Sequence, residues 1–268
     1  MPKTPITYYG GKQNMLRHIL PNIPKHRIYT EVFFGGGAVF FAKEPSESEV
    51  INDLDSFIIN FYEVCISDFE ALKQKVEATL FSRATYTVAN TMYKMPHLFN
   101  ELQRAWAFYV ATNMGFASGI GSWGFDKYGK RRKTFMNKKM AFDEGVHMRL
   151  ANVQVENLDA IKVLERYDSE DAFHYIDPPY VGTNLGHYGG YTEGDYRELL
   201  DALGGIRGKF LLSSFPSDIL DGYIEKNGWH SIAFTQSKSA VHARYRTGDT
   251  KKIEVLTANY PVGRGASQ

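Results

Sequence analysis

The sequence predicts an α/β fold with about seven strands in a mainly parallel sheet and a helical insertion. Three observations lead to this prediction. Short apolar runs of strand type alternate with segments of helical periodicity, the first such run ends abruptly in three glycines, and the long segment 56–148 is mostly helical in pattern. Because strands that alternate with helices are typical of a parallel sheet covered on both faces, we expect one sheet domain that carries an inserted region.

The first two strand-type runs lie close together in the chain. Residues 28–34 (IYTEVFF) are apolar and rich in strand-forming residues, and they end in the glycines at 35–37, which small and apolar residues follow at 38–42. This order predicts a strand, a tight turn and a helix. A second run at 49–51 (EVI) ends in NDLD at 52–55, so acidic side chains follow that strand. The spacing suits a βαβ unit.

The segment 56–148 is longer than an ordinary crossover between strands. One predicted helix has an apolar face formed by Phe69, Leu72, Val76 and Leu80, and Ser67 and Glu70 would form a capping box at its start. The 3.6-residue period of apolar residues continues from 98 to 109. We therefore expect residues 56–148 to form the insertion, and residues 1–55 and 149–268 to form the sheet domain.

Strand and helix patterns alternate again after the insertion. Strand-type runs occur at 153–155, 172–176, 209–215, 229–235 and 253–258, and helical signals occur at 196–203 and 219–224. The run at 172–176 (AFHYI) ends in the tetrapeptide DPPY at 177–180. With the first two runs, these strands complete the predicted sheet.

Composition narrows the class of protein. Hydrophobic residues make up 43% and charged residues 23% of the 268 residues, which is typical of soluble globular proteins. No stretch approaches the roughly 20 apolar residues of a membrane-spanning helix, and the first residues lack a signal-peptide core, so we expect a cytoplasmic protein without a membrane segment. The single Cys65 is expected to be a buried thiol, and the histidines show no metal-ligand spacing, which predicts no metal.

The positive charge is concentrated in one place. The net charge is only +1, yet residues 126–139 (DKYGKRRKTFMNKK) contain seven Lys or Arg and one acid. Such a run is either a solvated loop or hairpin, or a surface that binds nucleic acid. The run alone leaves both interpretations open.

The glycine turn and Asp53 are typical of a site for an adenosine-containing ligand. Glycines allow a ligand to approach the backbone closely, and a carboxylate at the end of the next strand can accept hydrogen bonds from ribose hydroxyls. The spacing is not GxGxxG and no GKS or GKT follows, which disfavours a nicotinamide dinucleotide and a P-loop. The alternative is a helix that packs tightly on its strand.

The DPPY tetrapeptide suits a planar exocyclic amine. Two prolines cannot continue a strand ladder, so the chain turns away at the strand end. The carboxylate of Asp177 and the carbonyl of Pro178 could each accept an N–H of the amine, and Tyr180 could stack on a base that has left the duplex. The alternative is an acidic turn with a buried tyrosine.

Four motifs in one order resemble the DNA adenine methylase family (the D12 class) over nearly the whole chain. They are YYGGK at 8–12, EVFFGGG at 31–37, ND at 52–53 and DPPY at 177–180. Val32 and Tyr8 depart from the family's usual proline and tryptophan but keep an apolar or aromatic character. The resemblance implies a Rossmann-like, S-adenosylmethionine (SAM)-dependent methyltransferase fold, with a reversed last strand and a target-recognition region inserted before the DPPY motif.

The resemblance also implies the activity and the site. It implies methyl transfer from SAM to N6 of adenine at specific sites in double-stranded DNA, by base flipping and direct in-line transfer, and we expect a monomer or weak dimer. The candidate catalytic residues are Asp177, Pro178, Pro179 and Tyr180. The candidate cofactor-binding residues are Tyr8, Lys12, Glu31, Phe33, Gly35, Gly37, Asp53 and Asp177. The candidate DNA-binding residues are Lys130, Arg131, Arg132, Lys133, Lys138 and Lys139.

Several alternatives stay open beside this interpretation. The nearest is a methyltransferase that acts on cytosine N4, on RNA or on a protein amide. A DNA-binding module without activity would be favoured if Asp177 or Tyr180 were missing, and a nicotinamide oxidoreductase lacks its phosphate fingerprint here. Residues 236–250, with several basic side chains, are either a second loop near the flipped base or plain surface.

Overall fold

The computed structural model describes residues 3–8, 10–115, 121–180, 190–237 and 251–263, and it contains a seven-stranded sheet. The strand order is β3-β2-β1-β4-β5-β7-β6. The strands are β1 Ile28–Glu31, β2 Ser48–Asn52, β3 Val153–Glu156, β4 Ala172–Ile176, β5 Lys209–Ser214, β6 His230–Ser237 and β7 Lys251–Ala258. Each of the seven predicted strand runs overlaps one of them.

The direction of the last strand differs from that of its neighbours. β1 is parallel to β4 and β4 is parallel to β5, whereas β7 is antiparallel to both β5 and β6. The predicted α/β fold with a mainly parallel sheet is therefore confirmed, as is the reversed last strand that the resemblance implied.

The helices are short between the first strands and numerous between β2 and β3. They are α1 Leu16–Ile19, α2 Ala38–Ala42, α3 Ser56–Ser67, α4 Phe69–Ala78, α5 Arg83–Lys94, α6 Glu101–Met114, α7 Lys130–Met140, α8 Glu144–Leu150, α9 Ala160–Tyr167, α10 Glu193–Gly205 and α11 Asp218–Asn227. Among the residues that the structure describes, no helix is both long and apolar enough to cross a membrane.

The chain divides into two compact units. Unit 1 comprises residues 1–16, 34–45 and 51–157, and unit 2 comprises residues 17–33, 46–50 and 158–268. The glycine turn and the N-terminal residues thus share a unit with helices α3 to α8. The division into a catalytic domain and an inserted recognition domain remains a proposal about function.

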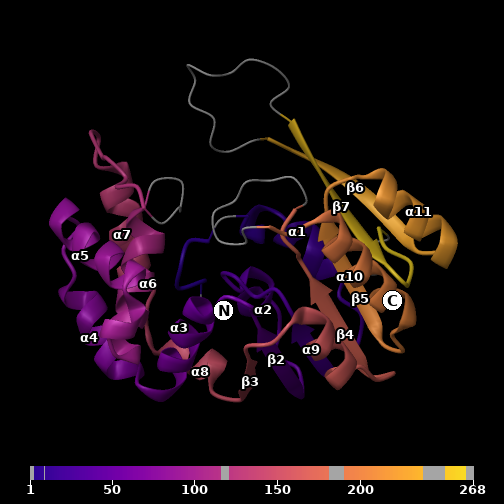
Figure 1. Ribbon diagram of the computed structural model, residues 1–268, viewed down its shortest axis with the longest axis horizontal. Coiled ribbons are helices and arrows are strands. Elements are labelled where there is room, and N and C mark those ends of the chain that lie inside the picture. The colour runs from indigo at the N-terminus through magenta and orange to yellow at the C-terminus, as the bar shows by residue number, and fades with distance from the viewer. Residues whose placement is uncertain (1–2, 9, 116–120, 181–189, 238–250, 264–268) are drawn as a thin grey trace. The chain divides into compact units, whose positions relative to one another are not determined.

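Unit 1 is built around helix α6, which contacts α3, α4, α5 and α7 (Figure 1, purple to pink). Asn100 and Gln103 form a capping box at the start of α6, and the Asp55 carboxylate accepts the Phe57 N–H at the start of α3. Each such cap stabilises a helix by about 1 kcal/mol. The side chains of Ala105, Phe108 and Tyr109 are fully buried on α6, so this helix is the centre of the unit's core.

Unit 2 has one hydrophobic core that joins its strands to α9, α10 and α11. The buried apolar residues of this core include Val163, Leu164, Ile176, Leu199, Leu200, Leu203, Phe210, Leu212, Leu220 and Trp229. All five residues of β4 are buried. This burial holds the strand that leads into the DPPY motif, which begins directly after it.

Two details of the predicted helix at 67–80 are wrong. Ser67 is the last residue of α3, and its hydroxyl donates to the Glu63 carbonyl instead of capping α4. Helix α4 ends at Ala78, and Leu80 follows it with 73% of its surface exposed. The apolar period ran past the helix end because Thr79 adopts an extended backbone there.

A buried histidine links β1 to β4 in unit 2. The ring of His174 has no exposed surface; its Nδ1 shares a hydrogen bond of 2.7 Å with the Thr30 hydroxyl, and its Nε2 lies 3.5 Å from an Asp168 carboxylate oxygen. Desolvation lowers the pKa of His174 below the 6.5 of an unburied histidine, although Asp168 opposes this shift. The folded protein therefore binds a proton at this site less readily than the unfolded chain does.

The free energy of unfolding is accordingly expected to fall as the pH drops below 6.5. At pH values between 6.5 and the lower pKa of the folded state, the unfolded chain binds a proton at His174 that the folded protein excludes. This one site therefore contributes up to about 1.4 kcal/mol per pH unit to the slope of the free energy of unfolding against pH. Urea unfolding at several pH values measures this slope. A His174→Gln variant is expected to show a shallower slope than the wild type, and equal slopes would contradict the assignment.

Candidate active site

The glycine turn after β1 has two residues in the left-handed region. Gly35 has φ 48° and Gly37 has φ 64°, a backbone conformation that residues other than glycine rarely adopt. A Cβ on Gly35 would lie 2.9 Å from the ring of Tyr8, and a Cβ on Gly37 would lie 2.6 Å from the ring of Phe34. The turn therefore requires glycine both for its backbone and for the close packing of these two rings.

Asp53 holds this turn from the end of β2. Its side chain is fully buried, and its carboxylate accepts the Gly35 N–H at 2.8 Å and the Asp55 N–H at 3.0 Å. The Tyr62 hydroxyl donates to the Gly35 carbonyl, so both sides of this glycine are fixed. The next residue, Leu54, is 65% exposed, so its apolar side chain lies at the surface.

Tyr8 and Lys12 lie in the same unit as the turn. The Tyr8 carbonyl accepts the Gly11 N–H, and the 3₁₀ helix that begins at Lys12 packs against α2, the helix that follows the glycine turn. Lys12 is 5% exposed, and its ammonium donates to the Gly10 carbonyl at 3.2 Å. The structure thus brings Tyr8, Lys12 and Asp53 around one turn.

Glu31 and Phe33 belong to unit 2. The Glu31 carboxylate is buried and accepts the Tyr29 hydroxyl at 2.7 Å, and the Phe33 ring meets Tyr191 edge-on and packs against the core of the unit. In the β1–β4 register Glu31 pairs with Tyr175. The carboxyl end of β1 therefore lies beside the end of β4, two residues before Asp177.

The DPPY motif follows β4 as predicted. Asp177 is half-buried, Pro178 is buried, and Pro179 and Tyr180 are half-buried. Burial, and then the negative charges of Asp177 and Glu254, hold the pKa of the Tyr180 phenol well above its ordinary value. The tyrosine consequently keeps its proton and acts as a hydrogen-bond donor.

Three residues that the sequence did not indicate hold Tyr180. Its hydroxyl donates to a carboxylate oxygen of Glu254 on β7, and the Ser213 hydroxyl donates to the same oxygen at 3.0 Å. Glu254 is 1% exposed. The Phe215 ring stacks on the Tyr180 ring at 3.9 Å between centroids and 24° between planes. The plane of the motif tyrosine is therefore fixed at the hydroxyl and at one face.

The basic run begins in a loop and then forms helix α7. Asp126, its one acid, accepts the Arg132 N–H in the first turn of the helix, and such backbone hydrogen bonds lower the pKa of this carboxyl. Phe135 is fully buried, which sets the inner face of the helix. Basic side chains that lie near Phe135 on the helix surface must then find partners inside the protein.

Three of the six candidate DNA-binding residues have such partners. Arg131 donates to the Gly115 carbonyl at the end of α6, and Lys139 donates to the carbonyls of Glu77 at 2.6 Å and Thr79 at 3.0 Å. Lys138 donates to the carbonyls of Thr4 at 2.6 Å and Ile6 at 3.1 Å. The other three candidates, Lys130, Arg132 and Lys133, are exposed.

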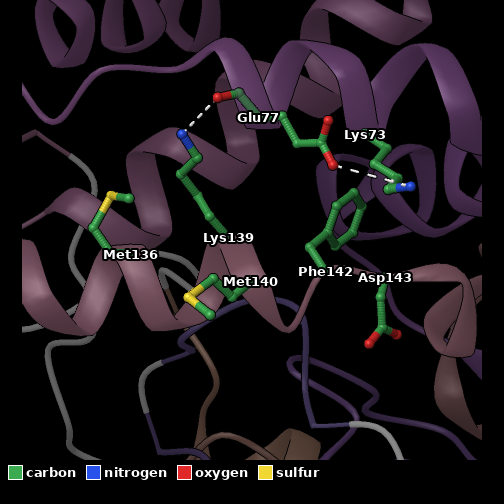
Figure 2. Close-up of a pocket in the computed structure, with 7 residues that line it drawn as sticks. All are labelled: Lys73, Glu77, Met136, Lys139, Met140, Phe142 and Asp143. Atoms are coloured by element: carbon green, nitrogen blue, oxygen red, sulfur yellow. Dashed lines mark hydrogen bonds and ion pairs between the residues drawn. The ribbon is translucent and has the colours of Figure 1, made fainter.

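A pocket of ≈ 260 Å³ lies between α4 and α7. Figure 2 shows the residues that line it. Lys139 points from α7 to the Glu77 carbonyl near the end of α4, and Glu77 in turn pairs with Lys73. Met136 and Met140 contribute exposed apolar surface. Of the predicted site residues only Lys139 lines this pocket, and no residue of the glycine turn lines it.

Among the described residues, no group of three or more His, Cys, Asp or Glu is arranged to hold a metal ion. The loop predicted at 236–250 lies outside the described residues from 238 onward.

Comparisons with known proteins identify a family and several similar proteins. Residues 8–208 match the family model of the D12 class N6 adenine-specific DNA methyltransferases. The chain is 24% identical to the Type II methyltransferase M1.LlaDCHI of Lactococcus lactis, over 94% of this chain and 93% of that protein. It is 25% identical to the Type II methyltransferase M.MjaIII of Methanocaldococcus jannaschii, over 72% of this chain and 74% of that protein.

Among solved structures, the chain is similar to a precorrin-6y C5,15-methyltransferase of Geobacter metallireducens, with a TM-score of 0.39 and 10% identity over 92% of this chain and 86% of that chain.

The family match covers residues 8–208, and so includes the YYGGK, glycine-turn, Asn52–Asp53 and DPPY elements described above. The chain therefore belongs to the family of D12 class N6 adenine-specific DNA methyltransferases.

Proposed function

We propose that this protein transfers the methyl group of SAM to N6 of adenine at specific sites in double-stranded DNA. The observation that carries the proposal is the DPPY motif at the end of a fully buried strand, beside a second strand whose end leads into the glycine turn. Ligands of open α/β sheets bind outside the carboxyl ends of such strands. DNA as the substrate follows from the family, and the residue roles below are part of the proposal.

The residues around the glycine turn fit SAM. Gly35 and Gly37 form a tight turn that a Cβ would disrupt, and the nearby Lys12 ammonium suits the carboxylate of the methionine end. Leu54 supplies an exposed apolar surface for adenine next to Asp53. Asp53 supports this site by accepting the Gly35 N–H; its carboxylate is buried, so a hydrogen bond from a ribose hydroxyl would require the surrounding residues to move when SAM binds. When bound, SAM supplies an electrophilic methyl group.

The DPPY motif fits the target adenine. The Asp177 carboxylate and the Pro178 carbonyl accept the two N–H groups of N6, which fixes the amine and directs its lone pair away from the ring. Tyr180 offers a ring face for stacking, while Phe215 and Glu254 keep that ring in place. The reaction is a direct displacement in which positioning does most of the work and no enzyme nucleophile takes part.

The proposed DNA surface is the exposed side of α7. Lys130, Arg132 and Lys133 are exposed there, whereas the other three basic candidates donate to carbonyls of the chain. Lysine and arginine bind phosphates, and arginine also suits the O6 and N7 atoms of guanine. We therefore restrict the proposed DNA contacts to these three residues.

Calorimetry with SAM in the presence of a metal chelator tests the cofactor assignment. We expect micromolar binding of both SAM and its demethylated product. The chelator should not weaken this binding, because none of the proposed contacts needs a metal.

Nucleoside mass spectrometry of DNA treated with the protein and SAM identifies the methylated base, and N6-methyladenine is the expected product. Binding of a nicotinamide dinucleotide without binding of SAM would overturn the cofactor assignment, and N4-methylcytosine would overturn the base.

A further inference from the structure

The N-terminal segment, residues 4–8, is held by two helices of unit 1. From α6, the Asn113 side chain accepts the N–H and the hydroxyl of Thr7, both at 3.0 Å, and donates to the Pro5 carbonyl at 3.4 Å. From α7, the Lys138 ammonium donates to the Thr4 carbonyl at 2.6 Å, the Thr4 hydroxyl at 3.2 Å and the Ile6 carbonyl at 3.1 Å. The segment is thereby fixed along its length.

Lys138 differs from the exposed basic residues of α7 in its surroundings. Burial, with a smaller effect of the nearby Lys3 charge, lowers the pKa of Lys138 to about 8. Thr4 and Ile6 are buried as well. The ammonium therefore meets backbone and hydroxyl oxygens in a largely buried site, where removal of Lys138 takes this donor away from the buried Thr4 and Ile6 carbonyls.

The N-terminal segment leads directly into the proposed cofactor site. Tyr8 is its last residue, and the Tyr8 ring and Cβ lie against the positions that side chains of Gly35 and Gly36 would occupy. Lys12 follows four residues later. A shift of the segment would move the Tyr8 ring off the glycine turn. Asn113 and Lys138 hold the segment at Thr7 and Ile6, just before Tyr8, and the Gln13 side chain adds a longer hydrogen bond of 3.4 Å to the Thr4 hydroxyl.

We infer that Lys138 is a positioning residue for the cofactor site, which fastens helix α7 to the N-terminal segment and thereby keeps Tyr8 against the glycine turn. The inference rests on the proposed function, since it assumes that SAM binds at this turn. It also separates two roles on one helix: the outer lysines of α7 face solvent for DNA, whereas Lys138 faces inward and serves the cofactor.

The affinity for SAM, measured by calorimetry, tests the inference. Lys138→Met keeps the length of the side chain and removes all three donors, and it is expected to raise the dissociation constant of SAM about tenfold. Lys138→Arg keeps a charged donor and is expected to restore part of the affinity. Lys133→Ala, an exposed lysine of the same helix, is the matched control and is expected to leave the affinity for SAM unchanged.

The salt dependence of DNA binding gives the opposite pattern. Lys133→Ala is expected to flatten the slope of log affinity against log salt by about one unit, and Lys138→Met is expected to leave it unchanged. A purely structural role of Lys138 would lower the melting temperature without changing the SAM affinity of the folded protein. If Lys138→Met does not fold, Lys138→Gln, which keeps a shorter amide donor, is measured in the same way with a smaller loss expected.

The outcomes distinguish the inference from the proposed function. Wild-type affinity for SAM in the folded Lys138 variants would overturn the positioning role. The role would also be overturned if Lys138→Met flattened the slope of log DNA affinity against log salt as much as Lys133→Ala does. Failure of the wild type to bind SAM would overturn the proposed cofactor site itself, whatever the variants do.

Discussion

Replacement of Asp177 by alanine is expected to lower the rate of methyl transfer by at least about a hundredfold. The change removes one of the two acceptors that would hold the target amine, and with it the charge that favours the aligned lone pair. The fold is expected to survive, because Asp177 is half-buried at a strand end whose preceding five residues remain packed. Single-turnover methylation with labelled SAM measures the effect on the chemical step.

Asp177→Asn is the matched control for this experiment. The amide keeps the size of the side chain and one acceptor oxygen but loses the charge, so a rate between those of the wild type and Asp177→Ala is expected. Circular dichroism and the melting temperature establish that both variants are folded. Near-normal turnover by Asp177→Ala would rule out the proposed active site.

Replacement of Arg132 and Lys133 by alanine is expected to flatten the salt dependence of DNA binding by about two units of slope. Each residue that neutralises a phosphate releases condensed counterions, and the net charge of +1 means that the chain as a whole contributes little attraction. Titration of cognate and scrambled duplexes at several salt concentrations measures the slope. Lys75→Ala, an exposed lysine of α4, is the control and is expected to leave the slope unchanged.

The two duplexes separate phosphate contacts from base contacts. Loss of a phosphate contact weakens binding equally on both, whereas loss of an arginine that reads a guanine edge costs about 1 to 3 kcal/mol on the cognate duplex and relaxes discrimination there. Unchanged curves on both duplexes would show that the exposed side of α7 is an ordinary solvated surface.

Local patterns predicted the strands and turns well because their causes are local. The apolar run at 172–176 is short for a helix, and the two prolines that follow Asp177 cannot continue a strand ladder, so a short buried strand that ends there is the favoured structure. The direction of β7 came from the family resemblance, since the pattern of a strand is the same in either direction.

Side-chain partners that are far apart in the chain were not predictable in this way. Lys138 and Lys133 are both lysines in one basic run, and Phe135 alone marks the inner face that separates them. Glu254 lies 74 residues from its partner Tyr180. An acid within an apolar strand was its one signal, and no local rule connects it to the DPPY motif.

The place of β7 in the sheet has a consequence for the order in which the molecule can be completed. β6 is made before β7 during synthesis, yet β7 lies between β6 and β5 in the sheet. Among the described strands β7 is the neighbour of β6, so β6 must wait for residues 251–258 to leave the ribosome. Glu254 arrives with them, and a nascent chain therefore carries its DPPY tetrapeptide long before it has the carboxylate that fixes Tyr180.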